Sequence, residues 1–212
     1  MNKKFLSNKK HIFWDFDGVI KDSVEIKSNA YEELFLRWGK TVSLKVRHHH
    51  RLNGGMSRFD KIPLYLSWTN IVPNENTVTE LCNDFSELVK LKVINSPWVP
   101  GVIDVINYST TQGIYSYIVT ATPQEEIEEI LDELQVIHYF KNIVGAPKKK
   151  VKAINEMIDF YGIALQDAIM IGDSKTDYEA AKENNIDFIL RKTHENLELQ
   201  SKIKCTMFDN FL

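Results

Sequence analysis

Two aspartates, Asp15 and Asp17, directly follow the apolar and aromatic run at residues 12–14. Such a run is typical of a buried strand, and Gly18 then allows a sharp exit. Carboxylates at the mouth of a buried strand are unfavourable unless a cation or hydrogen bonds hold them. In a parallel sheet these strand ends line the crevice where α/β proteins bind ligands. The pattern therefore indicates a polar site, although an ordinary strand that ends in an acidic turn has the same sequence.

Three further polar groups follow predicted strands later in the chain. Thr120 stands at the end of a strand predicted over residues 114–119. A lysine cluster occupies residues 148–150, and Asp173 and Asp177 follow the apolar run at 168–171. Because the carboxyl ends of parallel strands share one edge of a sheet, these groups are expected to lie near Asp15.

The second half of the chain alternates between strand and helix patterns. Repeated βα units imply a parallel sheet with right-handed crossovers. In addition to the strands at 114–119 and 168–171, we expect strands at 143–144 and 188–190. Helices are expected at 101–111, after Pro123, at 149–161 and at 174–184.

Residues 21–98 show helical periodicity without an intervening strand pattern. Helices are expected at 23–38, 41–50, 57–68 and 75–93, with Ser23 as an N-cap of the first. The Pro- and Gly-containing stretch at 97–101 is expected to lead back to the α/β pattern. The sequence thus predicts an α/β fold in which 1–20 and 99–212 form a Rossmann-like parallel-sheet core and 21–98 an inserted all-helical domain.

Composition excludes several classes of protein. The chain has 212 residues, 43% of them apolar and 11% aromatic, which is enough to build a core. A net charge of −3 gives no general attraction to nucleic acid or to an anionic membrane, and no apolar run is long enough to span a bilayer. Two cysteines far apart do not suggest a disulfide framework, so we expect a reduced, cytoplasmic location.

Four motifs in this order resemble those of the haloacid dehalogenase superfamily. They are DFDG at 15–18, IVTAT at 118–122, a lysine downstream and IGDSKTD at 171–177. The helical insertion after the first strand is similar to the branch with a helical cap, which includes phosphoglycolate phosphatases and β-phosphoglucomutase-like enzymes. The resemblance spans essentially the whole chain and implies an Mg²⁺-dependent enzyme acting on a small phosphate ester.

The resemblance also implies roles for the acids. Asp15 would be the nucleophile that forms an aspartyl-phosphate, and Asp17 the general acid and base. Mg²⁺ would be bound by Asp15, the backbone carbonyl of Asp17, and Asp173, with Asp177 supporting them. An aspartate at the second position resembles the phosphatase and phosphomutase members and disfavours dehalogenase and phosphonatase chemistry.

Phosphate-binding groups are implied next to the acids. Thr120 would donate its hydroxyl to a phosphate oxygen, with Ala121 beside it in the same motif. Three adjacent lysines compete for the motif lysine: Lys150 is favoured because the family often places it just before a helix, Lys148 is second, and Lys149 is the third. At least two of them are expected to be solvated.

The predicted helical insertion contains one candidate substrate contact. The stretch 54–58 resembles a cap loop that, in phosphoglucomutase-like relatives, directs an arginine at the distal anionic group of the substrate. Arg58 is that candidate, whereas an ordinary helix-start arginine would be solvated. Ser57 is expected to be the N-cap of this helix. The histidines at 48–50 and the glutamate-rich run at 125–133 are expected to be surface residues.

The sequence favours an Mg²⁺-dependent phosphatase of a small phosphorylated metabolite, acting as a monomer or homodimer without nucleic-acid or membrane partners. One alternative is a sugar phosphomutase. For a mutase the resemblance implies a histidine where Lys27 stands, which disfavours this alternative. The other is a non-catalytic binding protein on the same fold, which usually loses part of the acid set that is complete here.

Overall fold

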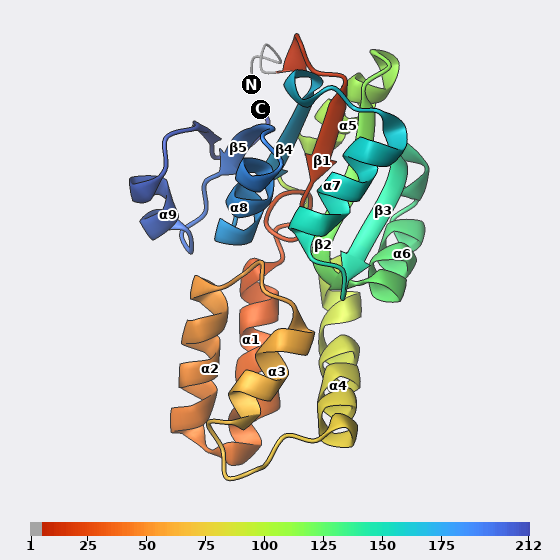
Figure 1. Cartoon of the computed structure of the whole chain (residues 1–212). Coiled ribbons are helices and arrows are strands. Elements are labelled where there is room, and N and C mark those ends of the chain that lie inside the picture. Colours follow the sequence, from red (N-terminus) through yellow and green to blue (C-terminus); the bar gives the residue numbers. More distant parts are fainter. Residues whose placement is uncertain (1–5) are drawn as a thin grey trace.

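A single parallel sheet of six strands forms the centre of the computed structural model, which describes residues 6–212. The strand order is β3-β2-β1-β4-β5-β6, and β1 pairs with β2 and β4 (Figure 1). Trp14, the last residue of β1, lies opposite Ile118 of β2 and Ile171 of β4. β4 ends one residue further on, whereas β2 continues to Pro123. The strands are β1 (His11–Trp14), β2 (Tyr115–Pro123), β3 (Phe140–Ala146), β4 (Ala168–Gly172), β5 (Asp187–Arg191) and β6 (Thr206–Phe208).

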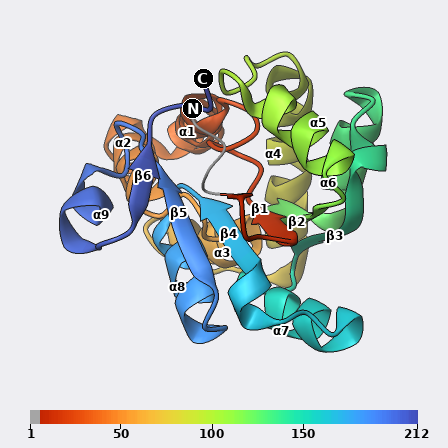
Figure 2. The same ribbon diagram turned by 90° about the horizontal axis from the view of Figure 1, so that it is seen from above.

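Helices cover both faces of the sheet (Figure 2). α5 (Val102–Thr111) and α6 (Gln124–Glu133) lie on one face, and α7 (Lys150–Tyr161) and α8 (Lys175–Glu183) on the other. Successive side chains of a strand point to opposite faces. Ile12 and Trp14 accordingly belong to the core on the α5 and α6 side, whereas Phe13 stacks on Tyr117 at 5.0 Å on the α7 and α8 side. The all-apolar strand β1 is thus explained by burial on both faces.

Four helices between β1 and α5 form a separate group beyond the carboxyl ends of the strands (Figure 1). This helical segment comprises α1 (Val24–Phe35), α2 (Lys40–Leu52), α3 (Arg58–Leu66) and α4 (Glu75–Ile94). Its buried aromatic core includes Tyr31, which stacks on Phe85 at 4.0 Å and meets Tyr65 edge-on at 5.5 Å. The predicted α/β class, with a Rossmann-like parallel sheet and an inserted all-helical stretch, is confirmed.

The two chain crossings between the sheet and the helical segment are joined to each other. Val99 N donates to Ile20 O at 3.0 Å, and the buried Lys21 donates from Nζ to Ile94 O at 2.9 Å. The same ammonium lies 4.2 Å from the centre of the Trp98 ring. These contacts fix the direction in which the helical segment projects over the strand ends.

Several predicted boundaries were wrong. The first helix ends at Phe35 and is followed by a 3₁₀ turn at Leu36–Trp38. Ser23 occupies the predicted N-cap position of α1 but makes no capping hydrogen bond. The Ser23 hydroxyl instead donates a hydrogen bond to Asp17 Oδ1 at 2.6 Å. Ser57, by contrast, caps α3 as predicted by accepting a hydrogen bond from Phe59 N.

The sheet is larger than the sequence predicted. β2 extends to Pro123 and β3 covers seven residues, because both strands continue past their apolar centres and pair with each other. α9 (Leu197–Lys202) and β6 had no clear periodicity and were not predicted. Among residues 6–212, no helix combines the length and the hydropathy that crossing a membrane requires. Residues 1–5, which the predicted core included, lie outside the described part of the chain.

Candidate active site

Three buried carboxylates gather at the carboxyl end of the sheet. Asp15 follows β1, Asp173 follows β4, and Asp177 lies in the first turn of α8. Each offers a carboxylate oxygen within 4.8 Å of the others. Asp15 is held against β4 because its backbone N–H donates to Ile171 O at 3.0 Å. We call Asp15, Asp173 and Asp177 the acid cluster.

One lysine contacts two members of the acid cluster. Lys150 Nζ lies 2.8 Å from Asp15 Oδ1 and 2.6 Å from Asp177 Oδ1, and the lysine is buried. Lys148 instead pairs with Glu156 on the surface, and Lys149 is exposed. Of the three lysines that the sequence left open, Lys150 is therefore the one placed in the site.

Asp177 uses its carboxylate to build the turn that carries Asp173. Its Oδ2 accepts from Ser174 N at 3.0 Å and from Ser174 Oγ at 2.6 Å, which forms a capping box at the start of α8. Its Oδ1 accepts from Lys150. Because both oxygens are engaged, Asp177 suits a supporting position better than a direct metal ligand.

Gly18 leaves the space that the acid cluster needs. Its φ of +76° lies in the left-handed region that favours glycine. A Cβ atom at this position would collide with the carboxylate of Asp173. The glycine of the DFDG motif thus allows both the turn after β1 and the close approach of β4.

The acid cluster brings together more carboxyl groups than the neighbouring cations can balance as anions. Burial and the neighbouring Asp177 carboxylate raise the pKa of Asp15 to about 7, against the opposing effect of Lys150. Burial, Asp15 and Asp177 also raise the pKa of Asp173 well above its usual value. Three carboxylates facing one ammonium are a donor set that suits a hard divalent cation such as Mg²⁺. Asp15 and Asp173 have the chemistry to hold this cation, together with the backbone carbonyl of Asp17.

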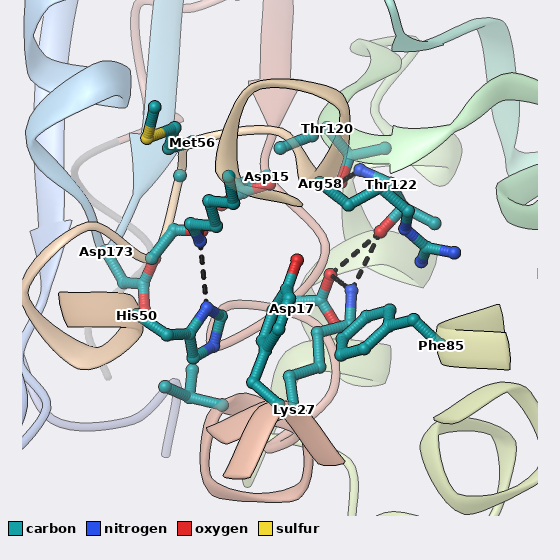
Figure 3. Close-up of a pocket in the computed structure, with 16 residues that line it drawn as sticks. Asp15, Asp17, Lys27, His50, Met56, Arg58, Phe85, Thr120, Thr122 and Asp173 are labelled. Carbon is teal, nitrogen blue, oxygen red and sulfur yellow. Dashed lines mark hydrogen bonds and ion pairs between the residues drawn. The ribbon is translucent and has the colours of Figure 1, made fainter. Parts of the chain in front are cut away.

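The side chain of Asp17 belongs to a different cluster. It accepts hydrogen bonds from Lys27 of α1 and from Thr122 Oγ1 at 3.0 Å (Figure 3). It also accepts one from Ser23 Oγ at 2.6 Å. Burial opposes ionisation, but the Lys27 ammonium and the hydrogen bonds hold the pKa of the Asp17 carboxyl below its usual range. Lys27 also donates to Thr122 Oγ1 at 2.9 Å. The two aspartates of the motif thus have opposite electrostatic environments.

Thr120 and Ala121 lie beside Asp15 in the wall of one pocket. The Thr120 hydroxyl oxygen accepts a hydrogen bond from Thr122 N at 3.2 Å, which leaves its proton available to another acceptor. The sheet side of this pocket and the helical segment face each other across it. Its lining residues include Asp15, Asp17, Lys27, Tyr31, His50, Arg58, Lys61, Phe85, Thr120, Ala121 and Asp173.

Arg58 lines the pocket, but its charge is already matched. Its Nη2 lies 2.6 Å from Glu126 Oε1 and its Nη1 2.8 Å from Glu126 Oε2, and both side chains are buried. Ser86 hydrogen-bonds to both groups. The interpretations of Arg58 and of residue 126 as solvated were wrong, since this pair links α3 to α6. A substrate anion at Arg58 would have to compete with Glu126.

Two basic residues of the pocket were not predicted. The expectation that residues 48–50 lie on the surface was wrong for His50, which is 3% exposed. It hydrogen-bonds to Lys61, which is 1% exposed. The helical period, with Val46 and His50 on one face of α2, was a usable signal for the histidine.

The chain is similar to known proteins over most of its length. The profile of the family described as haloacid dehalogenase-like hydrolase matches residues 12–191, and the chain belongs to this family. A phosphoglycolate phosphatase of Aliivibrio fischeri is 31% identical over 184 residues, covering 82% of this chain and 79% of the relative. A β-phosphoglucomutase structure from Clostridium difficile superposes with a TM-score of 0.76 at 18% identity, covering 96% of this chain and 92% of that one.

A second relative is longer than the region it shares. The phosphoglycolate phosphatase of Pseudomonas putida is 24% identical over 188 residues, which cover 81% of this chain. The chain spans 65% of the length of that relative.

Proposed function

We propose that this protein is an Mg²⁺-dependent phosphatase that hydrolyses a small phosphorylated metabolite through a phosphoryl group on Asp15. Residues 1–20 and 99–212 would form the catalytic core, and residues 21–98 the cap. The observation that carries this proposal is the position of Asp15, which belongs to the acid cluster, contacts Lys150 and lines the pocket. The names of the curated relatives support a phosphatase over other activities of the family.

In the first step the Asp15 carboxylate attacks phosphorus and the ester P–O bond breaks. The leaving oxygen takes a proton from the carboxyl group of Asp17. Lys150 keeps the anionic nucleophile from repelling the phosphate, and the Thr120 hydroxyl donates to a phosphoryl oxygen. Mg²⁺, when bound, neutralises charge that develops on the transferred group.

In the second step water attacks the phosphoryl group and Asp15 is released. Asp17 takes the proton of this water as a general base, and inorganic phosphate leaves. The contacts from Lys27, Ser23 and Thr122 favour the anionic form of Asp17, which is the form that this step needs. Because Lys27 belongs to α1, movement of the cap would change this pairing and help Asp17 to carry a proton in the first step.

A sugar phosphomutase is less well supported. The structural likeness to a β-phosphoglucomutase concerns the fold. For a mutase the resemblance implied a histidine at position 27. In this chain Lys27 occupies that position and donates a hydrogen bond to Asp17. The Lys27 cation keeps Asp17 in the anionic form that accepts the proton of water in the second step.

A phosphate-release assay tests this proposal. A panel of sugar phosphates, phosphorylated acids and p-nitrophenyl phosphate is incubated with the protein, with Mg²⁺ or with EDTA. We expect release from at least one ester only when Mg²⁺ is present. Conversion of a sugar monophosphate to its isomer in the presence of a bisphosphate would instead identify a mutase, and no reaction with any ester would support a binding protein.

A further inference from the structure

Lys61 is a buried lysine that has no carboxylate partner. Its Nζ lies 2.8 Å from His50 Nδ1 and 3.3 Å from Gly54 O, and 1% of the residue is exposed. Within residues 6–212, no Asp or Glu oxygen lies within salt-bridge distance of this nitrogen. A buried ammonium without a counterion is costly, so its presence needs a reason.

The other cations of the pocket are each paired with an acid. Lys150 contacts Asp15 and Asp177, Lys27 contacts Asp17, and Arg58 contacts Glu126. Their charges are largely balanced by the protein itself. Lys61 is therefore the pocket cation of the described chain whose charge is left for a ligand to balance.

The surroundings of Lys61 repel further positive charge. Burial and the nearby Lys27 lower the pKa of Lys61 well below its usual value, against the smaller opposing effect of the Asp17 carboxylate, which is paired with Lys27. Burial and Lys61 likewise lower the pKa of His50. A lysine ammonium can only donate hydrogen bonds, so His50 Nδ1 accepts from it and leaves Nε2 to carry the ring proton. An anion next to Lys61 would relieve this repulsion.

Lys61 lies in the same pocket as the reacting groups but belongs to the helical segment. Lys61 and His50 line the same pocket as Asp15 and Asp17, but they come from α3 and α2 of the cap. Figure 3 shows His50 across the pocket from Thr120 and Thr122 at the end of β2. A small ester with its phosphate at Asp15 would extend its other end toward this cap side.

We propose that Lys61 binds a second anionic group of the substrate, so that the substrate is a phosphate monoester carrying a carboxylate or a second phosphate. This inference rests on the proposed phosphatase function. It assigns the distal contact to Lys61, whereas the sequence had suggested Arg58 for that role. A charge-assisted hydrogen bond of this kind changes kcat/KM by roughly 10- to 150-fold.

The experiment compares esters that differ in the distal group. One arm pairs 3-phosphoglycerate with glycerol 3-phosphate, and a second pairs fructose 1,6-bisphosphate with fructose 6-phosphate. The protein with its natural sequence is expected to prefer the anionic member of at least one pair by roughly 10-fold or more in kcat/KM. The arm that shows the preference identifies the distal group as a carboxylate or a phosphate.

Neutral variants then connect the preference to Lys61. In Lys61→Met the preference should fall to about threefold or less, because kcat/KM should fall by a larger factor for the anionic member than for the neutral member or for p-nitrophenyl phosphate, which lacks a distal anion. Lys92→Met, at an exposed lysine of α4, is the matched control and should keep the preference. Circular dichroism checks folding, and Lys61→Gln serves as a second neutral variant.

Three outcomes would contradict parts of this account. A preference that survives both neutral variants at Lys61 would overturn the assignment to this lysine. Equal rates for charged and neutral members of both pairs, in the protein with its natural sequence, would overturn the proposed substrate class. Failure to hydrolyse any ester, p-nitrophenyl phosphate included, would overturn the phosphatase function on which the inference rests.

Discussion

The pocket has a sheet side, formed by residues at the strand ends, and a cap side, formed by residues of the helical segment. The two sides lack countercharges of opposite sign. On the sheet side, three carboxylates face the single ammonium of Lys150. On the cap side, Lys61 and His50 are buried next to each other, and no acid among residues 6–212 pairs with either of them. The sheet side therefore has room for a cation and the cap side for an anion. A phosphate ester with a distal anionic group, bound together with Mg²⁺, would satisfy both.

The largest expected effect comes from the nucleophile on the sheet side. Asp15→Asn should abolish turnover, because an amide is nearly isosteric with the carboxylate but is a poor nucleophile. It should also leave the protein folded, since replacing the carboxylate removes like-charge repulsion from Asp177. Phosphate release and circular dichroism measure the two effects. Activity equal to that of the natural sequence would exclude Asp15 as the nucleophile.

The proposed metal site should distinguish two acids of the same cluster. Asp173→Asn should remove activity or require far more Mg²⁺, because a direct ligand loses its charge. Asp177→Asn should lower the activity by about 10- to 100-fold, as is usual when a group that orients a metal ligand is lost. Titrating the activity of both variants with Mg²⁺ provides the comparison. The opposite ranking would make Asp177 the ligand and Asp173 the supporting residue.

The lysine cluster allows a matched test of charge on the sheet side. Lys150→Ala should lower kcat/KM by at least about 10-fold, because the buried contact with Asp15 is lost. Lys149→Ala removes an exposed neighbour and should have little effect. Steady-state kinetics on one ester suffice for the comparison. Equally small effects of the two changes would show that the sheet side does not need the ammonium.

The smallest expected effect concerns stability on the cap side. At pH 7 Lys61→Met should raise the free energy of unfolding by about 1–2 kcal/mol, because a buried, unmatched charge is replaced by an apolar group. The pKa of Lys61 is lowered in the folded protein from the ordinary value of 10.5. Between these two values the unfolded chain binds more protons, so the stability of the natural sequence rises with pH there.

The gap in stability between Lys61→Met and the natural sequence should therefore narrow as the pH increases from 7 toward 10. Urea unfolding at several pH values measures it. Subtracting the two curves cancels the titration of other groups. A gap that is constant or widens with pH would show that Lys61 is not destabilised by its charge. Lower stability of the variant at every pH would point to a purely structural lysine.

The sheet side was largely predictable from the sequence because its groups lie at strand ends. Asp15 and Asp173 directly follow apolar runs, so the parallel-sheet pattern was enough to predict that they lie close together. Lys150 was favoured among three lysines because the family that the chain resembles often places its motif lysine just before a helix. The sequence pattern did not predict the edge strand β6, because this strand has only three residues and is formed through its pairing with β5.

The cap side was less predictable because its contacts join distant residues. Arg58 and Glu126 are 68 positions apart and belong to helices that meet only in the folded chain. Helical periodicity indicates that a residue is buried but not which partner it meets. A glutamate on a charged helix, or one histidine among three, therefore resembled a solvated residue until its partner was known.

Passage of the phosphoryl group through Asp15 can be tested directly by locating that group on the protein. In Asp17→Asn the water attack loses its general base, whereas p-nitrophenolate can leave without a general acid, so a phosphorylated enzyme should accumulate with p-nitrophenyl phosphate. The variant is mixed with Mg²⁺ and p-nitrophenyl phosphate, quenched within seconds, digested and analysed by mass spectrometry. The account predicts one phosphoryl group on the peptide containing Asp15, and none in the Asp15→Asn, Asp17→Asn double variant. A phosphoryl group on another residue, or one that persists in the double variant, would contradict it.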